Sequence, residues 1–100
     1  MLFMSVFTWD SEKRDAVFKR RVEAKPPAGF KVIGEWLDIG GGRVFMVSEG
    51  DDPKAGLAAS LAWNDLGELE IIPIMSAEDV LKAAASMKAT ASKKAAPRKR

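Results

Sequence analysis

The stretch Phe30–Glu49, FKVIGEWLDIGGGRVFMVSE, decides the fold. Its two halves are rich in Val, Ile, Phe and Trp, the residue types that suit a pleated, packed surface. Between them stands Gly40-Gly41-Gly42, and glycine tolerates the positive φ angles that tight strand connections demand. We therefore predict a β-hairpin over these twenty residues.

Both faces of this hairpin are predicted to be apolar. Regular alternation places Val32 and Trp36 on one face and Ile33 and Leu37 on the other. A small antiparallel sheet normally keeps one face in water, so a sheet that is apolar on both faces needs two covers.

Five further elements surround the hairpin. Residues 2–8 alternate between two apolar sets, which predicts a central strand buried on both faces. A helix capped by Asp10 or Ser11 is predicted to end near Ala24, because Pro26-Pro27 follows. The remaining expected elements are a helix capped by Asp52 and begun by Pro53, with Leu57/Leu61 and Ala58/Ala62 facing the core; an edge strand over 68–75 that contains Pro73; and a helix capped by Ser76.

This strand–helix–strand–strand–helix–strand order predicts an α+β, ferredoxin-like βαββαβ antiparallel sheet with an additional C-terminal helix. Two helices can cover only one face of such a sheet. The simplest cover for the other face is an identical sheet related by a two-fold axis, which makes a homodimer of the dimeric α/β barrel type. We place the domain at residues 1–87 and a basic, frayed or disordered tail at residues 88–100.

The composition removes several kinds of chemistry. The chain has no Cys, His or Tyr, so the commonest general base near neutral pH and the commonest transition-metal ligand are both missing. We therefore expect neither a metal nor another cofactor. No apolar run approaches the ~20 residues of a membrane span, and the start reads as a strand, so a cytoplasmic location is expected.

The positive charge is concentrated at the C-terminal end. Residues 88–100 carry six basic residues and no acid, while the chain as a whole has a net charge of +2. Such a tail could contact nucleic acid or an anionic membrane surface. It lacks interleaved aromatic residues, so a solvated tail is the favoured interpretation and contact with nucleic acid stays open.

A few polar residues interrupt the predicted strands. By strand alternation Ser5, Glu35, Glu49 and Glu70 could share one face, and buried carboxylates with raised pKa values can act as acids or bases. The plainer interpretation is that they lie at strand ends or form ion pairs across the hairpin, and Glu70 is the strongest of the three glutamates. Trp36 and Trp63 could line a pocket for a planar ligand, although core packing explains large aromatic residues more simply.

Several short motifs resemble those of the uncharacterised family called domain of unknown function DUF3303. They are the MLFM start, Gly34-x-Trp36, Asp51-Asp52-Pro53, Trp63-x-Asp65-Leu66 and the strand Glu70-Ile71-Ile72-Pro73. The resemblance covers about residues 1–85 and implies a ferredoxin-like fold of the dimeric α/β barrel kind, without an assigned activity. It also implies that many members carry His where this chain has Leu37.

Three functions fit these features. The leading hypothesis is a cytoplasmic homodimer that binds a small, largely apolar molecule between sheet and helices or between subunits. Analogy of fold suggests a cofactor-free enzyme of the monooxygenase or isomerase type, which would have to use carboxylates, Ser5 or indoles. The third hypothesis is an interaction protein that uses the basic tail. The candidate ligand-binding residues are Ser5, Glu35, Trp36, Glu49, Trp63 and Glu70.

Overall fold

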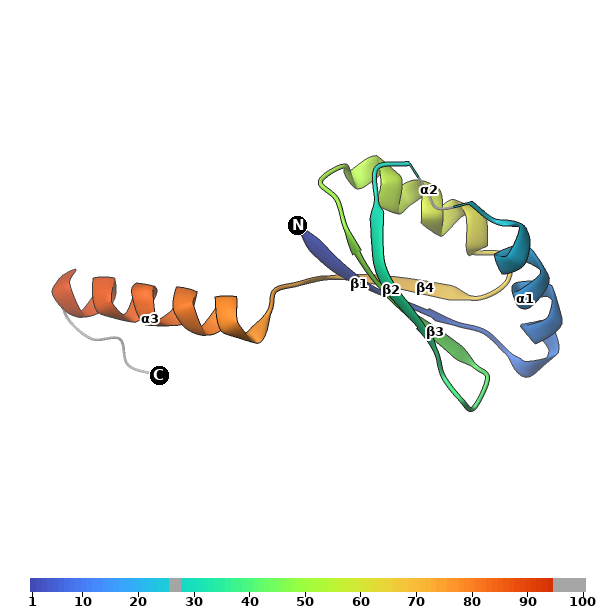
Figure 1. The fold of residues 1–100 in the computed structure, drawn as a ribbon, viewed down its shortest axis with the longest axis horizontal. Helices are drawn as coiled ribbons and strands as arrows, with labels where there is room; N and C mark the ends of the chain where they lie inside the picture. Colours follow the sequence, from blue (N-terminus) through green and yellow to red (C-terminus); the bar gives the residue numbers. More distant parts are fainter. Residues whose placement is uncertain (26–27, 95–100) are drawn as a thin grey trace.

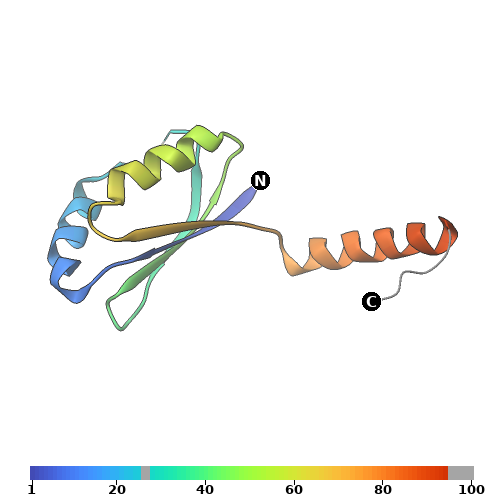
Figure 2. The same cartoon turned by 180° about the vertical axis from the view of Figure 1, so that it is seen from behind.

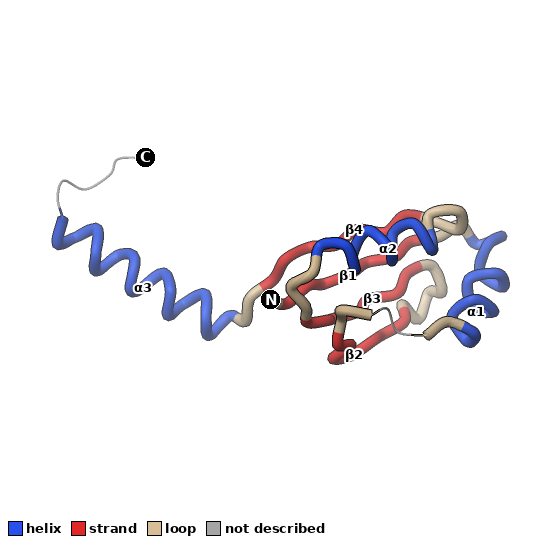
Figure 3. Tube along the Cα trace, turned by 90° about the horizontal axis from the view of Figure 1, so that it is seen from above, coloured by secondary structure: helices blue, strands red, loops and turns tan. Residues whose placement is uncertain are grey.

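The computed structural model describes residues 1–25 and 28–94 and forms an α+β fold. Its four strands make one antiparallel sheet in the order β2-β3-β1-β4. Helices α1 and α2 lie on one side of this sheet, and α3 lies beyond one end of it (Figures 1 and 3). The strands are β1 (Leu2–Thr8), β2 (Lys31–Leu37), β3 (Arg43–Glu49) and β4 (Glu68–Ile74); the helices are α1 (Arg14–Glu23), α2 (Pro53–Trp63) and α3 (Ala77–Lys94).

Local sequence signals are confirmed at several turns and ends. The predicted hairpin is formed by β2 and β3, and Gly41 adopts a φ of 86° in its turn. Asp38 supports this turn by accepting a hydrogen bond from the Gly40 N–H at 2.9 Å and one from Arg43 Nε at 3.1 Å. The Gly40 N–H first and Arg43 second lower the pKa of the Asp38 carboxyl below its usual value. Strand β1 is central and β4, with Pro73, is an edge strand, as the sequence predicts.

The start of α1 differs from its prediction. Asp10 makes no side-chain capping bond, and a short 3₁₀ turn over Ser11–Lys13 precedes the α-helix. The start of α2 follows its prediction, because Asp52 Oδ1 accepts a hydrogen bond from the Lys54 N–H at 2.9 Å and Pro53 begins the helix.

We call the side of the sheet that α1 and α2 cover the helix face and the opposite side the open face. Residues paired directly across neighbouring strands share a face, so the register assigns each side chain. The helix face includes Ser5, Phe7, Val44, Met46 and Ile71. The open face includes Met4, Val6, Phe45, Val47 and Ile72.

A register shift in β2 overturns the predicted alternation of that strand. The pairing with β3 shifts between Val32 and Gly34, as in a β-bulge. Val32 therefore faces the helices, whereas Trp36 pairs with Phe45 on the open face. The prediction that Val32 and Trp36 share a face is wrong, because one extra residue reverses the orientation of every side chain after it.

Helix α2 is rotated relative to its predicted orientation. Leu57 and Leu61, predicted to face the core, are 60% and 63% exposed. The side that faces the sheet is made of alanines, with Ala55 buried and Ala58, Ala59 and Ala62 above the strands. The hydrophobic core is a cluster of Phe7, Trp9, Val17 and Leu66, against which Val44, Trp63 and Leu69 pack.

Helix α3 extends past the predicted end of the domain. It continues to Lys94, so residues 88–94 of the predicted tail are helical rather than frayed. The rest of that tail, residues 95–100, lies outside the described residues. Ser76 caps the helix as predicted, with its Oγ accepting the Asp79 N–H at 3.0 Å. The chain continues from β4 into α3 away from α1 and α2 (Figure 2).

We predict that Asp52→Ala lowers the free energy of unfolding by about 1 kcal/mol, because it removes the oxygen that caps α2. Asp10→Ala is the matched control, since Asp10 precedes a helical segment without capping it, and it should leave the free energy nearly unchanged. Urea unfolding followed by tryptophan fluorescence measures both variants. Equal losses for the two variants would contradict the assignment of the cap.

Candidate functional site

A cavity of about 490 Å³ lies between the helix face of the sheet and the two helices that cover it. Its sheet side is formed by residues of all four strands, and its other side by α1, α2 and the segments that join them to the sheet. Most of the lining is apolar. Among its lining residues are Ser5, Glu35, Ser48, Ala59, Trp63 and Ile71.

The cavity exists because the side chains of α2 that face the sheet are small. Ala58, Ala59 and Ala62 face the sheet, and a methyl group fills much less of the space beneath a helix than a leucine side chain. At one end of the sheet, larger residues fill the same space: Phe7 and Trp63 pack edge to face with ring centroids 5.5 Å apart. The helices are therefore held to the sheet at this end, and the space above Met46 and Ile71 stays open.

An ion pair between α1 and β2 forms part of the cavity wall. Arg21 Nε lies 2.9 Å from Glu35 Oε2, and Arg21 Nη2 donates a second, shorter bond to Glu35 Oε1. The Glu35 side chain is only 17% exposed, so this carboxylate is largely removed from water. Hydrogen bonding to Glu35 raises the pKa of the Arg21 guanidinium above its usual value. The pair therefore places a neutralised charge at the cavity.

A second ion pair ties α1 to the loop that follows α2. Arg20 Nη1 lies 2.6 Å from Asp65 Oδ1 and Arg20 Nη2 lies 2.9 Å from Asp65 Oδ2, and Nη1 also donates to the Ala62 carbonyl at 2.9 Å. The guanidinium lies over the Trp63 ring at 5.6 Å from its centroid. These side-chain hydrogen bonds from Arg20 are the main cause of the lowered pKa of the Asp65 carboxyl.

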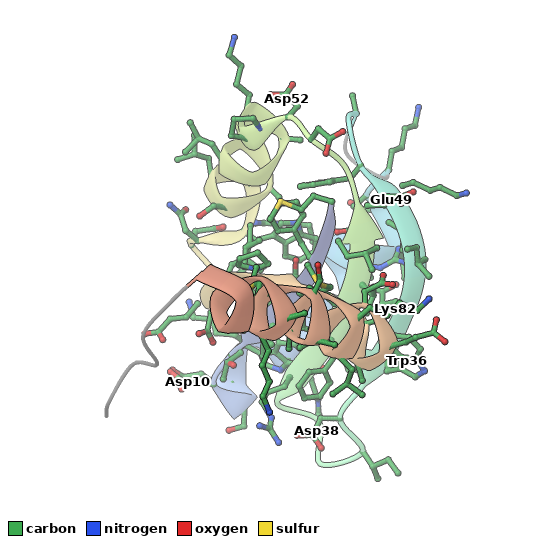
Figure 4. The ribbon with its side chains drawn as sticks, turned by 90° about the vertical axis from the view of Figure 1, so that its left-hand side faces the viewer. Asp10, Trp36, Asp38, Glu49, Asp52 and Lys82 are labelled. Atoms are coloured by element: carbon green, nitrogen blue, oxygen red, sulfur yellow. The ribbon has the colours of Figure 1, made fainter. Side chains whose placement is uncertain are left out.

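The six sequence-predicted residues divide between the two faces of the sheet. Ser5, Glu35 and Trp63 line the cavity. Glu70 pairs with Val6, and Glu49 pairs with Leu2 and Lys31, so both glutamates belong to the open face with Trp36. Figure 4 labels Glu49 and Trp36 on this side of the molecule. The expectation that all three glutamates share a face with Ser5 is wrong, because alternation within a strand does not fix its register against its neighbours.

Other lining residues were not among the predicted ones. Ser48 is 2% exposed on the helix face, and Trp9 is buried with no hydrogen-bond partner for its Nε1 among the described residues. Arg20 and Arg21 also line the cavity. The only sequence signal for Arg21 is its place beside Val17 and Phe18 on the apolar side of α1, where a charged residue needs a partner.

The described residues contain no cluster of three or more potential metal ligands of the Cys, His, Asp or Glu type. In the same part of the chain, no helix combines the length and the apolar character that crossing a bilayer requires. What the site offers is an apolar interior, two small hydroxyl side chains, two arginines that are already paired with carboxylates, and the exposed Lys25.

The fold and this cavity define a small α+β protein whose helices stand partly clear of a four-stranded antiparallel sheet. The family model described as domain of unknown function (DUF3303) matches residues 1–88, and the chain belongs to this family. No curated protein and no solved structure matches the chain.

We predict that Asp65→Asn makes the protein less stable at neutral pH and reduces its sensitivity to acid. The pKa of Asp65 is lowered from 3.8 in the folded protein, so its stabilisation is present above that value and is lost as the pH falls toward the lower folded-state pKa. The difference in stability between the unmodified protein and the variant should therefore shrink below pH ~4. Urea unfolding at pH 7 and pH 3 measures it.

Asp15→Asn is the control for this experiment. It removes the same charge from an exposed position beside Arg14, at an N–O distance of 3.6 Å. An exposed pair of this kind contributes little, so the control should resemble the unmodified protein at both pH values. A gap between Asp65→Asn and the unmodified protein that stays constant with pH would refute the role given to this ion pair.

Proposed function

We propose that this protein binds a small, largely apolar molecule in the cavity between the sheet and helices α1 and α2. The observation that carries the proposal is the cavity itself, about 490 Å³ in volume and lined mainly by apolar side chains. Pockets for small molecules typically measure about 300–1,000 Å³ and combine apolar walls with a few polar groups. Here Ser5, Ser48 and the Arg21–Glu35 pair supply those polar groups.

The paired charges favour a neutral ligand. Arg20 and Arg21 line the cavity, and each already donates two or more hydrogen bonds to a carboxylate. An anionic ligand that used these arginines would have to displace Asp65 or Glu35, and displacing Glu35, whose side chain is 17% exposed, would leave a largely buried carboxylate without its partner. A neutral molecule with a hydroxyl or carbonyl group can use the serine hydroxyls without that cost.

An enzyme of the cofactor-free monooxygenase or isomerase type is the alternative. It would have to use Glu35, the one predicted glutamate at the cavity, as its acid or base. Glu35 accepts three hydrogen bonds from Arg21, so both of its carboxylate oxygens are already engaged by this guanidinium and are less available to a ligand. Binding therefore has more support than catalysis, and more than an interaction role for the tail, part of which lies outside the described residues.

The proposal includes a homodimer of ferredoxin-like subunits. The element order and the strand order β2-β3-β1-β4 support the ferredoxin-like interpretation. The open face carries Val6, Phe45, Val47 and Ile72, and no layer formed by the described residues lies above it; an apolar surface of this kind marks an interaction site. A second copy would cover it, either sheet on sheet, as in the dimeric α/β barrel that the resemblance to the family suggests, or with another of its surfaces. A cytoplasmic location remains a prediction of the sequence alone.

We predict that Ala59→Phe abolishes binding of a neutral fluorescent probe, N-phenyl-1-naphthylamine, while the protein stays folded. The new ring would enter the cavity from α2, which has room for it, so the free energy of unfolding should be equal or higher. Leu57→Phe is the matched control on the exposed side of the same helix and should bind the probe normally. Equal binding by both variants would place the probe elsewhere and reject the cavity as its site.

We also predict that the purified protein is a dimer at micromolar concentration. Static light scattering should give about twice the 10.9 kDa mass of one chain, because burying the open face removes apolar surface from water. A mass of one chain over the whole micromolar range would reject the homodimer and leave the cavity proposal untouched.

A further inference from the structure

Helix α3 lies apart from the rest of the molecule. In the described part of the chain it packs against no other helix or strand, and it leads away from the end of the sheet (Figures 1 and 2). The radius of gyration is 18.2 Å, whereas a compact chain of this length has about 13 Å. An arm of this kind is unusual unless something outside its own chain packs against it.

One side of α3 is apolar. Helical spacing places Val80, Leu81, Ala84 and Met87 on one side, and Leu81 and Met87 are 70% and 71% exposed. Most helices in proteins gain their stability by packing an apolar side rather than from helix propensity alone. Glu78, Asp79, Lys82 and Ser86 lie on the other side of the helix.

The open face of the sheet is the complementary surface. Trp36 is 57% exposed there, and its ring lies so close over Gly34 that a Cβ at this position would be 2.5 Å from the ring (Figure 4). The indole therefore lies against the sheet and extends its apolar surface over β2. Phe45, Val47 and Ile72 continue this surface across β3 and β4.

The dimensions of the two surfaces agree. An α-helix of 18 residues is about 27 Å long, and a strand of seven residues is about 23 Å long. One α3 can therefore span the sheet from end to end. Its own sheet is not available to it in this structure, because the helix begins two residues after β4 and points away from that sheet.

The charges on the two surfaces also match. Glu70 is a carboxylate of the open face, halfway along the edge strand β4 and paired with Val6, and no basic residue of the described chain forms an ion pair with it. On α3, helical spacing places Lys88 beside Leu81 and Ala84, at the border of the apolar side. A lysine at this position can reach a carboxylate on a surface that the apolar side covers.

We infer that α3 of each copy packs, with its apolar side, across the open face of a second copy, and that Lys88 pairs with Glu70 of that copy. The exchange gives two identical contacts about a two-fold axis, so it closes as a dimer and leaves neither surface uncovered. This inference rests on the proposed homodimer and identifies the segment that covers the open face. It differs from a barrel in which two sheets pack directly on each other and α3 takes no part.

Reversal of the charges in the full chain tests the contact. Glu70→Lys and Lys88→Glu should each raise the dimer dissociation constant roughly tenfold at low salt, because each creates two like-charge contacts in the symmetric dimer. The variant with both substitutions should recover the affinity of the unmodified protein. Lys82→Glu, which makes the same charge change on the polar side of α3, is the matched control and should have no effect. Sedimentation velocity gives the dissociation constants.

Leu81→Ser tests the apolar side independently and should also weaken the dimer tenfold or more. A cooperative urea-unfolding transition followed by circular dichroism verifies that each variant is folded. A dimer that withstands Leu81→Ser and Lys88→Glu would overturn the inference while the homodimer stands, and so would failure of the double variant to recover. An unmodified protein that is monomeric would overturn both.

Discussion

The packing of Phe7 against Trp9 and Trp63 is the contact on which the rest of this structure depends. It lies at one end of the sheet, where Val17 and Leu66 complete a core cluster and Val44 and Leu69 add contacts from β3 and β4. Both covering helices are held to the sheet at this end. Farther along α2, the residues above the strands are alanines, and the same layer that is dry and filled at one end becomes a cavity at the other. A single cluster therefore determines both where the fold is stable and where a ligand could enter.

The two arginines of α1 make this arrangement possible. A helix that stands clear of its sheet loses apolar contacts, and α1 compensates with ion pairs at its C-terminal end: Arg20 to Asp65 and Arg21 to Glu35. Guanidinium–carboxylate pairs with two bonds fix the geometry as well as the distance. They also neutralise both of these guanidinium charges at the cavity wall, where most of the lining is apolar.

Much of the fold could be predicted because its signals are local. Gly40-Gly41-Gly42 indicates a turn, Asp52-Pro53 a helix start and Pro73 an edge strand, and each depends on only a few neighbouring residues. The faces of the strands could not be predicted in the same way. A shift at Ile33 and Gly34 reverses the orientation of the rest of β2, and the register of β4 against β1 places Glu70 opposite the helices. Gly34 is the sequence signal for the register shift in β2, since a glycine within a strand often marks a bulge or a close approach of another group.

The same features explain why only half of the predicted site residues line the cavity. Ser5 and Trp63, two of the residues that the sequence predicts, line the cavity, but the partner of Glu35 lies 14 residues away on another element. No alternation pattern connects a helix residue to a strand residue across a loop. The orientation of α2 was also beyond local rules, because Leu57 and Ala58 both recur at a spacing of four and either side could face the sheet.

Exposure of the leucine side is consistent with a chain that presents apolar surfaces on the open face, on α3 and on α2, a distribution that a monomer in water rarely retains. Assembly with a second copy would remove two of these three surfaces from water at once, and this makes the exchange of α3 a more economical arrangement than the packing of two sheets alone.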